Sequence, residues 1–355
     1  MLNFTVGPVM SDSEITEVAN HSAPYFRTPE FSKVMYENEQ MILKMLHAPE
    51  NSRCVFLTSS GTGAMESIVM NVLNDQDKAI IVNGGSFGQR FVELASLHGR
   101  RFTEVKCEFG KQLTKKQLEG LEDHNVMLIN MHETSSGLLY DMKMVSDFCK
   151  TNHILLLIDA ISSFIADELD MSELNAAAVI TGSQKALACH PGIAIIALAP
   201  EAVKRIAQNK EVCMYLSLKQ ALINGERGQT PFTPAVTTLL QIHTRLKGIL
   251  FRGGVQKERD SIVSVAEDFR KKIKNLPLKP VSEHPSNAVT TLHPLNVNAS
   301  EVVRILKDEY KIWVCPNGGE MADAVFRVGH IGHITYKDNH KLVDALHHMH
   351  DRGLL

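Results

Sequence analysis

Hydrophobic residues along the chain form short continuous runs that alternate with longer stretches of helical spacing. The apolar residues between positions 29 and 47 fall on one helical face, which predicts an amphipathic helix. Seven short apolar runs predict strands at 54–58, 78–82, 102–107, 126–131, 154–158, 177–181 and 193–198. Because these strands alternate with helices, we expect an α/β fold with a mainly parallel central sheet flanked by helices. Runs that are apolar at every position, such as 154–158, indicate that both sheet faces are covered.

The pattern changes near residue 228, where the segment 228–234 contains two prolines and a glycine. This change indicates a domain boundary in that region. The elements predicted beyond it are helices at 235–250 and 255–273, a strand at 288–292, a helix at 300–306, strands at 312–314 and 324–328, and a helix from 337 onward. We therefore expect a large domain over 15–250 and a small α+β domain that consists of 251–355 together with 1–14.

Composition narrows the class of protein. The chain has 355 residues, and its 37 Lys and Arg nearly balance its 40 Asp and Glu, so nucleic acid is not an expected partner. The six cysteines contain no CxxC pair, which favours reduced thiols over a zinc site or a disulfide framework. No leader peptide and no apolar stretch of about 18 residues are visible. We expect a soluble, cytoplasmic protein without a membrane partner.

Two segments carry polar groups at the ends of predicted strands. The glycine-containing turn 57–66 lies between a strand and a helix, where free N–H groups can bind a phosphate. The alternative there is a tight turn with a hydroxyl N-cap. Asp159 ends the apolar run 154–158, which would place its carboxylate in the crevice where open α/β sheets bind ligands. The alternative is an aspartate that caps the next turn.

Two basic residues stand in apolar surroundings. Lys185 follows the predicted strand 177–181 among small residues, where a desolvated amine has a lowered pKa and becomes nucleophilic. The alternative is an ordinary surface lysine. Arg327 lies in an apolar strand of the small domain and is a candidate to bind a substrate carboxylate through two parallel hydrogen bonds. The alternative is a salt bridge between the domains.

A phosphate-binding turn, a carboxylate, a lysine and a distant arginine are together what a pyridoxal-phosphate enzyme needs. The sequence resembles the class V aminotransferases of fold type I, in the branch with alanine–glyoxylate, serine–pyruvate and 2-aminoethylphosphonate–pyruvate transaminases. The resemblance extends nearly end to end, through the motifs at 4–8, 26–31, 60–64, 132–137, 182–185 and 327–332. It implies that the cofactor is pyridoxal 5'-phosphate.

The resemblance also implies a role for individual residues. Lys185 would attach the cofactor and then move a proton as general acid and base, while Asp159 would pair with the pyridine nitrogen. The other cofactor-binding positions are Ser60, Gly61, Thr62 and Gln184 at the phosphate, Phe87 on the ring and Thr134 near the ring oxygen. For Phe87 an ordinary core position is the alternative. Arg327 would bind the α-carboxylate of the substrate.

Further residues bear on assembly and specificity. Thr233 matches a residue that reaches the phosphate of the neighbouring subunit in the family, which implies a homodimer with shared active sites. Arg27 matches a substrate-pocket arginine, but Phe26 precedes it where relatives have histidine. Val6 likewise replaces a proline at the substrate entrance. The side of the pocket that selects the donor can therefore differ from that of relatives.

Three function classes remain open. The first is an aminotransferase that moves an amino group from L-alanine, L-serine or 2-aminoethylphosphonate to pyruvate or glyoxylate. A phosphonate would need further cations, for which Arg27 and Arg90 are candidates. The second is a lyase or desulfurase on the same fold, with Cys315 as its mobile thiolate. The third is a non-catalytic relative of the fold.

Histidines gather near the C-terminus but show no metal-binding pattern. His330 and His333 lie near Arg327, and His347, His348 and His350 fall in the last helix. No carboxylate or cysteine stands at metal-ligand spacing from them. We therefore expect no metal and assign these histidines to the solvated surface.

Overall fold

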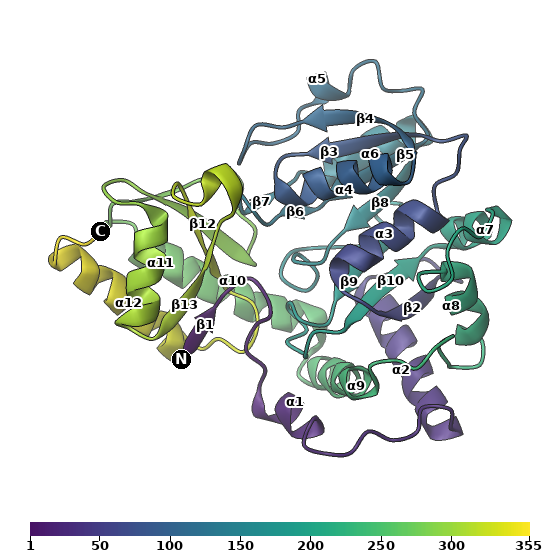
Figure 1. Ribbon diagram of the computed structural model, residues 1–355, viewed down its shortest axis with the longest axis horizontal. Coiled ribbons are helices and arrows are strands. Elements are labelled where there is room, and N and C mark those ends of the chain that lie inside the picture. Colours follow the sequence, from purple (N-terminus) through teal and green to yellow (C-terminus); the bar gives the residue numbers. More distant parts are fainter.

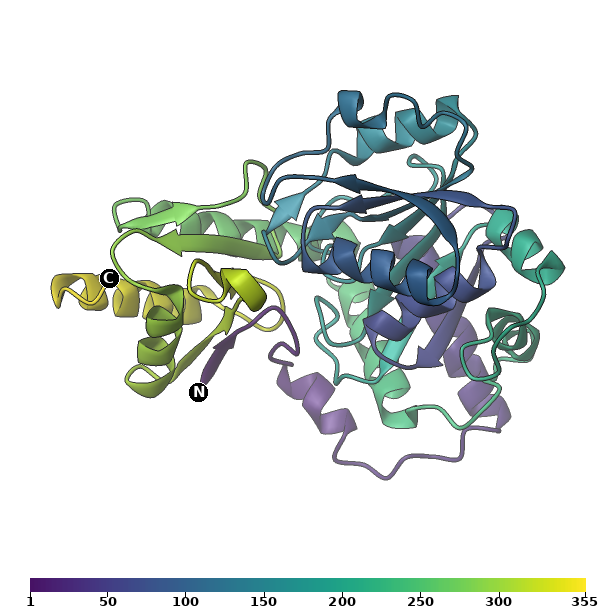
Figure 2. The same ribbon diagram turned by 45° about the horizontal axis from the view of Figure 1, so that its top comes forward.

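The computed structural model of the protein describes all residues from 1 to 355. A seven-stranded sheet and a five-stranded sheet lie side by side, each with its own helices (Figure 1). Figure 2 shows that the N-terminal strand joins the smaller, green and yellow part of the molecule, which also contains the C-terminus. A short hairpin of β6 (His132–Glu133) and β7 (Leu138–Leu139) stands apart from both sheets in the hydrogen-bond pattern.

The seven-stranded sheet has the order β2-β10-β9-β8-β5-β3-β4. Its strands are β2 (Arg53–Thr58), β3 (Lys78–Asn83), β4 (Arg101–Lys106), β5 (Val126–Asn130), β8 (Leu155–Asp159), β9 (Ala176–Gly182) and β10 (Ile193–Leu198). All neighbours pair in parallel except β10, which is antiparallel to β9 and to β2. The connection 183–192 between β9 and β10 is too short for a crossover helix, so the chain has to turn back.

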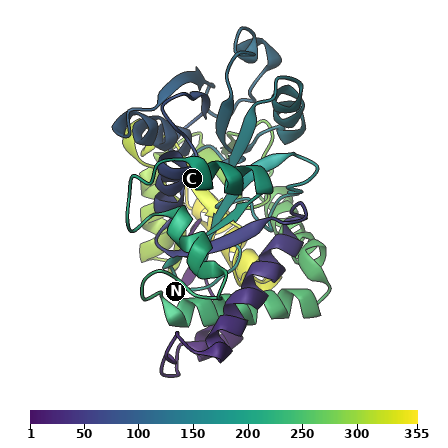
Figure 3. The same ribbon diagram turned by 90° about the vertical axis from the view of Figure 1, so that its right-hand side faces the viewer.

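Helices cover both faces of this sheet. One face packs against α2 (Pro29–Met45), α6 (Met142–Thr151) and α9 (Val236–Phe251). The other packs against α3 (Gly61–Asn71), α4 (Ser86–Leu97), α7 (Pro200–Gln208) and α8 (Leu218–Gly225). Figure 3 shows the purple α2 and the teal α7 and α8 at the near side. Because side chains alternate between the faces of each strand, every strand contributes to both cores, which explains the continuous apolar runs in the sequence.

The five-stranded sheet has the order β1-β13-β14-β12-β11. Its strands are β1 (Leu2–Phe4), β11 (Leu278–Pro280), β12 (Val289–Pro294), β13 (Ile312–Pro316) and β14 (Phe326–Gly329). Its helices are α10 (Gly254–Lys272), α11 (Ala299–Asp308) and α12 (Tyr336–Asp351), which enclose a separate apolar core with this sheet. The remaining elements are the short helices α1 (Ser13–Val18) and α5 (Lys115–Leu118) and the 3-10 helix η1 (Gly319–Met321).

The predicted α/β class with a mainly parallel central sheet is confirmed, and all seven predicted strands of the central sheet are present. The segment 228–234 leads into α9, which packs on α1 and α2. The division of the chain at residue 250 falls near the end of α9 and stays a prediction. No helix is long and apolar enough to cross a lipid bilayer.

Candidate active site

Asp159 and Lys185 lie close to the carboxyl ends of two adjacent parallel strands. Asp159 is the last residue of β8, and Lys185 follows the end of β9. Neighbouring parallel strands end at the same edge of a sheet, which is where ligands bind in open α/β folds. Burial lowers the pKa of Lys185 most, and the charges of Arg327, Asp159 and Arg90 also act on it, so these four side chains lie in one region of the molecule.

Asp159 is a buried carboxylate, 5% exposed, without a cation in contact. It accepts hydrogen bonds from the backbone N–H of Ile161 at 2.8 Å and from the side-chain amide of Asn130. Burial raises the pKa of Asp159 to about 6 because desolvation disfavours the charged form. The structure thus holds a carboxylate whose ionised form needs a cationic partner.

Lys185 lies under the N-terminal segment of the chain. Its Nζ donates to the backbone carbonyl of Val6 at 2.6 Å. Burial lowers the pKa of Lys185 to about 8, so roughly a tenth of the amine is neutral at pH 7. Gly7 makes this contact possible, because a Cβ there would lie 2.7 Å from Lys185 Cδ and the backbone has φ +127°.

The turn before α3 is an anion-binding geometry. Ser60 is the N-cap of α3 and its hydroxyl accepts from Gly63 N at 3.4 Å. The first N–H groups of a helix have no partner within it, and the helix dipole favours a negative charge there. Gly61 is packed against Ile161, where a Cβ would come within 2.4 Å of the isoleucine side chain. Ser60, Gly61 and Thr62 are therefore placed as a phosphate site requires.

Phe87, in the first turn of α4, is half-buried beside Arg90. The Arg90 guanidinium lies over the Phe87 ring, 4.9 Å from its centroid, and donates to Thr62 Oγ1 at 3.1 Å. Arg90 therefore links the aromatic side chain of α4 to the first turn of α3. The sequence indicates Arg90 only as a candidate to bind a phosphonate, because a contact between two helices leaves no local pattern in the sequence.

Thr134 ends a short chain of buried hydrogen bonds. Its hydroxyl is 2.7 Å from Ser162 Oγ, which is 2.9 Å from His132 Nδ1. Burial, with Lys185 and Arg327 nearby, lowers the pKa of His132 to about 3, so its imidazole is neutral. His132 and Ser162 were not assigned from the sequence, although both lie in or beside segments that were singled out.

Glu133 is a further buried carboxylate that sequence reasoning missed. It accepts from the backbone N–H groups of Phe87 at 3.2 Å and Gly88 at 2.9 Å, and from Ser135. A carboxylate at a helix N-terminus is stabilised by the helix dipole and by these unpaired donors. Glu133 thus fixes the start of α4, and with it Phe87, against the hairpin that carries Thr134.

Arg327 lies on β14 opposite Cys315 of β13, and is 9% exposed. Its Nη2 donates to the Pro316 carbonyl at 2.6 Å and to Cys315 Sγ at 3.2 Å. Its Nε has no hydrogen-bond partner. An unpaired buried guanidinium donor is costly, and it is the kind of group that a bound carboxylate would satisfy.

Three predicted residues make no contact with this cluster through hydrogen bonds. Arg27 is exposed and donates to Gln229 Oε1 at 3.0 Å and to the Pro231 carbonyl at 3.4 Å. Thr233 is exposed and forms no side-chain hydrogen bond. Gln184 is half-buried beside Lys185, and only its backbone carbonyl is bonded, by Val9 N at 3.4 Å.

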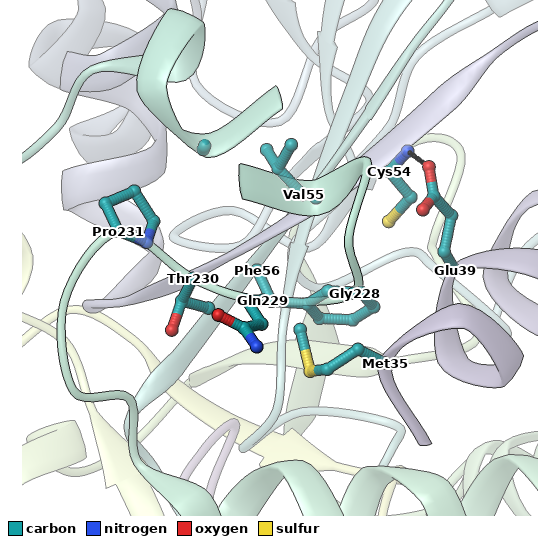
Figure 4. A pocket seen from close by; sticks show the side chains of 11 residues that line it. Met35, Glu39, Cys54, Val55, Phe56, Gly228, Gln229, Thr230 and Pro231 are labelled. Atoms are coloured by element: carbon teal, nitrogen blue, oxygen red, sulfur yellow. Dashed lines mark hydrogen bonds between the residues drawn. The ribbon is translucent and has the colours of Figure 1, made fainter. Parts of the chain in front are cut away.

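A cavity lies below the segment that carries Gln229, between α2 and β2 (Figure 4). Its volume of about 20 Å³ has room for roughly one water molecule. Neither Lys185 nor Arg327 lines it. This cavity is therefore too small to be the substrate site, and it is not lined by the reactive groups.

One assignment from the sequence is wrong. His330 was placed on the solvated surface, but it is 2% exposed, and burial lowers its pKa well below its usual range. The cause is tertiary packing, because the turn after β14 folds back between α10 and β12. The ring centroid of His330 lies 5.3 Å from that of Phe269. No group of residues in the structure has the composition of a metal site.

A family model described as Aminotransferase class-V matches residues 11–332. The chain belongs to the class-V aminotransferase family. It is similar to the soluble hydrogenase 42 kDa subunit of Anabaena cylindrica, with 29% identity covering 94% of this chain and 88% of that protein. It is also similar to L-aspartate–glyoxylate aminotransferase of Paracoccus denitrificans, with 24% identity covering 94% and 86%. The alanine–glyoxylate aminotransferase structure from Nostoc sp. superimposes with a TM-score of 0.91 at 22% identity, covering 98% of this chain and 94% of that one.

The aminotransferase thus has the fold of type I pyridoxal-phosphate enzymes and depends on pyridoxal 5'-phosphate. Its residues fit that cofactor. Asp159 is a buried carboxylate without a cation, as a protonated pyridine nitrogen requires, and the start of α3 offers free N–H groups for the phosphate. Lys185 is an amine whose pKa of about 8 suits attachment to an aldehyde.

Proposed function

We propose that this aminotransferase moves the amino group of a small donor, L-alanine or L-serine in the first place, to pyruvate or glyoxylate. The observation that carries the proposal is the buried guanidinium of Arg327, whose Nε has no hydrogen-bond partner. The positive charge of Arg327 also adds to the effect of burial in lowering the pKa of Lys185. One such arginine binds one carboxylate. The names of the relatives from Paracoccus and Nostoc, which both contain glyoxylate, support the acceptor class.

The surroundings of the other arginines favour donors with a single acidic group over 2-aminoethylphosphonate. Arg90 is engaged by Thr62 and by the ring of Phe87, and Arg27 is bonded to Gln229 and Pro231. A phosphonate or a second carboxylate would need one of these side chains to give up its partners. An amino acid with a small neutral side chain needs only Arg327.

The chain's own groups account for the steps of such a reaction. The carboxylate of the substrate would bind Arg327, which fixes the orientation of the Cα–H bond. Pyridoxal phosphate, when bound, supplies a ring that accepts the electron pair of the broken Cα–H bond. Asp159 would keep the ring nitrogen protonated, and Lys185 Nζ would remove the Cα proton and return it as general acid.

The remaining assignments concern how the cofactor is held. Ser60, Gly61, Thr62 and Gln184 would bind the phosphate, Phe87 would stack on the ring, and Thr134 would lie near the ring oxygen. The hydrogen bonds of Thr134 to Ser162 and of Glu133 to the start of α4 support these positions, since they fix the side chains before any ligand binds.

A dimer would explain why Arg27 and Thr233 lie outside the cluster. Both are exposed, and Gln229 and Pro231, which Arg27 contacts, belong to the same segment as Thr233. Nearby apolar side chains are more than half exposed, namely Tyr25, Val212, Met214 and Tyr215. Exposed apolar groups of this kind mark interaction surfaces. We propose that a second copy of the chain covers them and receives Thr233 and Arg27 at its active site.

The test is an absorption spectrum of the purified enzyme before and after L-alanine, L-serine or 2-aminoethylphosphonate is added separately. Cofactor attached to Lys185 absorbs in the visible, and we expect alanine or serine to bleach the band and pyruvate or glyoxylate to restore it. A band that none of the three donors bleaches would show that the proposed donor class is wrong. Bleaching by 2-aminoethylphosphonate alone would overturn the preference for single-acid donors.

A further inference from the structure

A network of buried polar side chains joins the two sheets behind the candidate active site. It begins at Asp167, which lies between β8 and β9 and is 2% exposed. The Asp167 carboxylate accepts hydrogen bonds from the hydroxyl of Ser286, from Asn287 N at 2.9 Å and from Asn287 Nδ2 at 3.0 Å. Ser286 and Asn287 lie between β11 and β12. A single carboxylate of the central-sheet part thus receives three donors from the small-sheet part.

Arg270 of α10 extends the network into the small sheet. It donates to the carbonyls of Ser286 and Val289 and, through Nε, to Thr290 Oγ1 at 2.9 Å. Burial lowers the pKa of Arg270, and the charge of Asp167 opposes that shift. The buried carboxylate of Asp167 and the half-buried guanidinium of Arg270 therefore compensate each other across Ser286.

The network ends beside the substrate-binding strand. Thr290 Oγ1 also forms a hydrogen bond of 2.7 Å with His330 Nε2. His330 N donates to the Ala288 carbonyl at 2.9 Å, and Thr291 of β12 pairs in register with Arg327 of β14. The segment that Asp167 holds therefore continues directly into the strand that supports Arg327.

The starting point of the network, Asp167, is joined to Asp159 by one short turn of the chain. Asp159 ends β8, and the turn from Ala160 to Asp167 follows it with hydrogen bonds from Phe164 N to the Ala160 carbonyl and from Asp167 N to the Ser163 carbonyl. Asp159 and Arg327 thus belong to different sheets, and Asp167 links the segments that carry them. Substrate binding depends on the distance between these two groups, because the substrate has to meet Arg327 and the cofactor site at the same time.

We propose that Asp167 is a positioning residue that holds Arg327 at the correct place relative to Asp159 and Lys185. The inference rests on the proposed function of Arg327 as the carboxylate anchor. It assigns Asp167 no contact with substrate or cofactor. Its role is to fix the small sheet on the large one, because a buried carboxylate with three donors tolerates little movement.

One further contact between the two parts of the chain is exposed and supplies a matched control. The Glu283 carboxylate accepts from Gln112 N at 2.6 Å and from Lys111 Nζ at 3.2 Å. Here the carboxylate belongs to the small-sheet part and the donors belong to the central-sheet part. This link is in contact with solvent, where such bonds contribute little to stability. Glu283→Gln and Asp167→Asn are therefore the same chemical change at an exposed and at a buried link.

The experiment compares holoenzyme of the wild type, Asp167→Asn and Glu283→Gln. In Asp167→Asn the side-chain NH2 would face the N–H or O–H group of Asn287 or Ser286, so one hydrogen bond of the link would be lost. We expect KM for the amino acid and for the 2-oxo acid to rise about tenfold, which corresponds to about 1.4 kcal/mol. The cofactor affinity should stay within about twofold and kcat should change less than KM. Glu283→Gln should leave all three values unchanged.

A second readout does not depend on turnover. The pyridoxal form of the enzyme does not transaminate a 2-oxo acid, so pyruvate binding to it reports on Arg327 alone, and Trp313 on β13 is the single tryptophan of the chain. We expect the dissociation constant of pyruvate, from Trp313 fluorescence, to rise about tenfold in Asp167→Asn. Hydrogen exchange of β12 and β14 should be faster in this variant than in Glu283→Gln.

The outcomes separate the inference from the function on which it rests. Unchanged pyruvate affinity and unchanged exchange in a folded Asp167→Asn protein would overturn the inference, as would a loss of cofactor affinity equal to the loss of pyruvate affinity. If Asp167→Asn does not fold, Ser286→Ala, which removes one of the three donors, should give a smaller change of the same sign, and no change would overturn the inference. Failure of the proposed function would appear in the wild type, as donors that do not bleach the cofactor, whereas hydrogen exchange would still test Asp167.

Discussion

At the scale of single residues, the site contains buried ionisable groups whose charged forms are unfavourable until a ligand of opposite charge binds. Asp159 has a raised pKa and Lys185 a lowered one, in both cases mainly because burial disfavours the charged form. Such shifts gather at functional sites, where stability is given up for reactivity. The carboxylate is destabilised until a cation pairs with it, and the amine is kept partly neutral for nucleophilic attack.

Asp159→Asn should stabilise the cofactor-free protein at pH 7.5 while it abolishes transamination. A pKa raised to about 6 from 3.8 corresponds to about 3 kcal/mol of destabilisation above pH 6. Asn130 has an unpaired Oδ1, so its amide can turn to accept from the new side chain. Thermal unfolding of both proteins without cofactor is the measurement.

The same comparison at lower pH provides the control. The folded protein binds the Asp159 proton more tightly than the unfolded chain, so the penalty is lost as the pH falls through 6 towards 4. The difference in free energy of unfolding between variant and wild type should therefore shrink across this range. A variant that is less stable than the wild type at pH 7.5 would contradict the explanation.

Cys315→Ala should keep transamination. The thiol lies on β13 and accepts a hydrogen bond from Arg327, so it is held on a strand and not on a mobile loop. Arg327 retains the Pro316 carbonyl when the sulfur is removed, and we expect kcat/KM for the amino donor to change less than about threefold. Steady-state kinetics test this. Complete loss of activity would support the lyase or desulfurase alternative instead.

At the scale of elements, the proposed cofactor site consists of two helix starts that are linked by side-chain contacts. Ser60 caps α3, and Glu133 accepts from the first N–H groups of α4. Arg90 connects the two helices through Thr62 and the ring of Phe87. Each helix start is therefore fixed by residues distant in sequence, and the N–H groups and the aromatic ring are aligned before the cofactor binds.

Arg90→Met should weaken cofactor binding by up to about thirtyfold, because a hydrogen bond and a cation–π contact of roughly 1 kcal/mol each are lost. The dissociation constant of pyridoxal phosphate, from its absorbance on titration into cofactor-free protein, is the readout. Gln89→Met on the same helix removes only exposed contacts to Asn83 and Glu93 and serves as the control. Equal affinities for the two variants would show that Arg90 does not order the site.

At the scale of the whole molecule, the exposed position of Thr233 makes assembly testable. If Thr233 completes the phosphate site of the neighbouring subunit, Thr233→Glu should repel the phosphate there and inactivate the homodimer. We expect Lys185→Ala to inactivate its own subunit, because Lys185 is the proposed attachment site of the cofactor. Mixed dimers of the two variants would contain one intact site, formed by Lys185 of one chain and Thr233 of the other.

Co-expression with two affinity tags isolates these mixed dimers. We expect them to recover about half of the wild-type activity per dimer, because one of two sites is intact, while each parent stays inactive. Two Lys185→Ala chains with different tags control for the purification. Mixed dimers as inactive as their parents would show that Thr233 acts within its own subunit or has no role.

The sequence by itself determined where the strands of the central sheet lie and which residues carry reactive groups at their ends. Apolar runs such as that before Asp159 are local signals, and the spacing of motifs around Lys185 and Arg327 identified the family now shown by comparison. These features depend on neighbours a few positions away, so they can be recognised without a fold.

Only the tertiary structure decided which partners these residues have. The hydrogen bond from Lys185 to the Val6 carbonyl joins segments that are distant in sequence. The position of the Arg90 guanidinium over Phe87 and the burial of His330 likewise depend on how the folded elements pack. The antiparallel direction of β10 likewise depends on the fold, because the short connection 183–192 returns the chain to the sheet directly beside β9. Hydrogen bonding and desolvation are set by what surrounds a group in space, so pKa shifts and the link through Asp167 become visible only once the chain is folded.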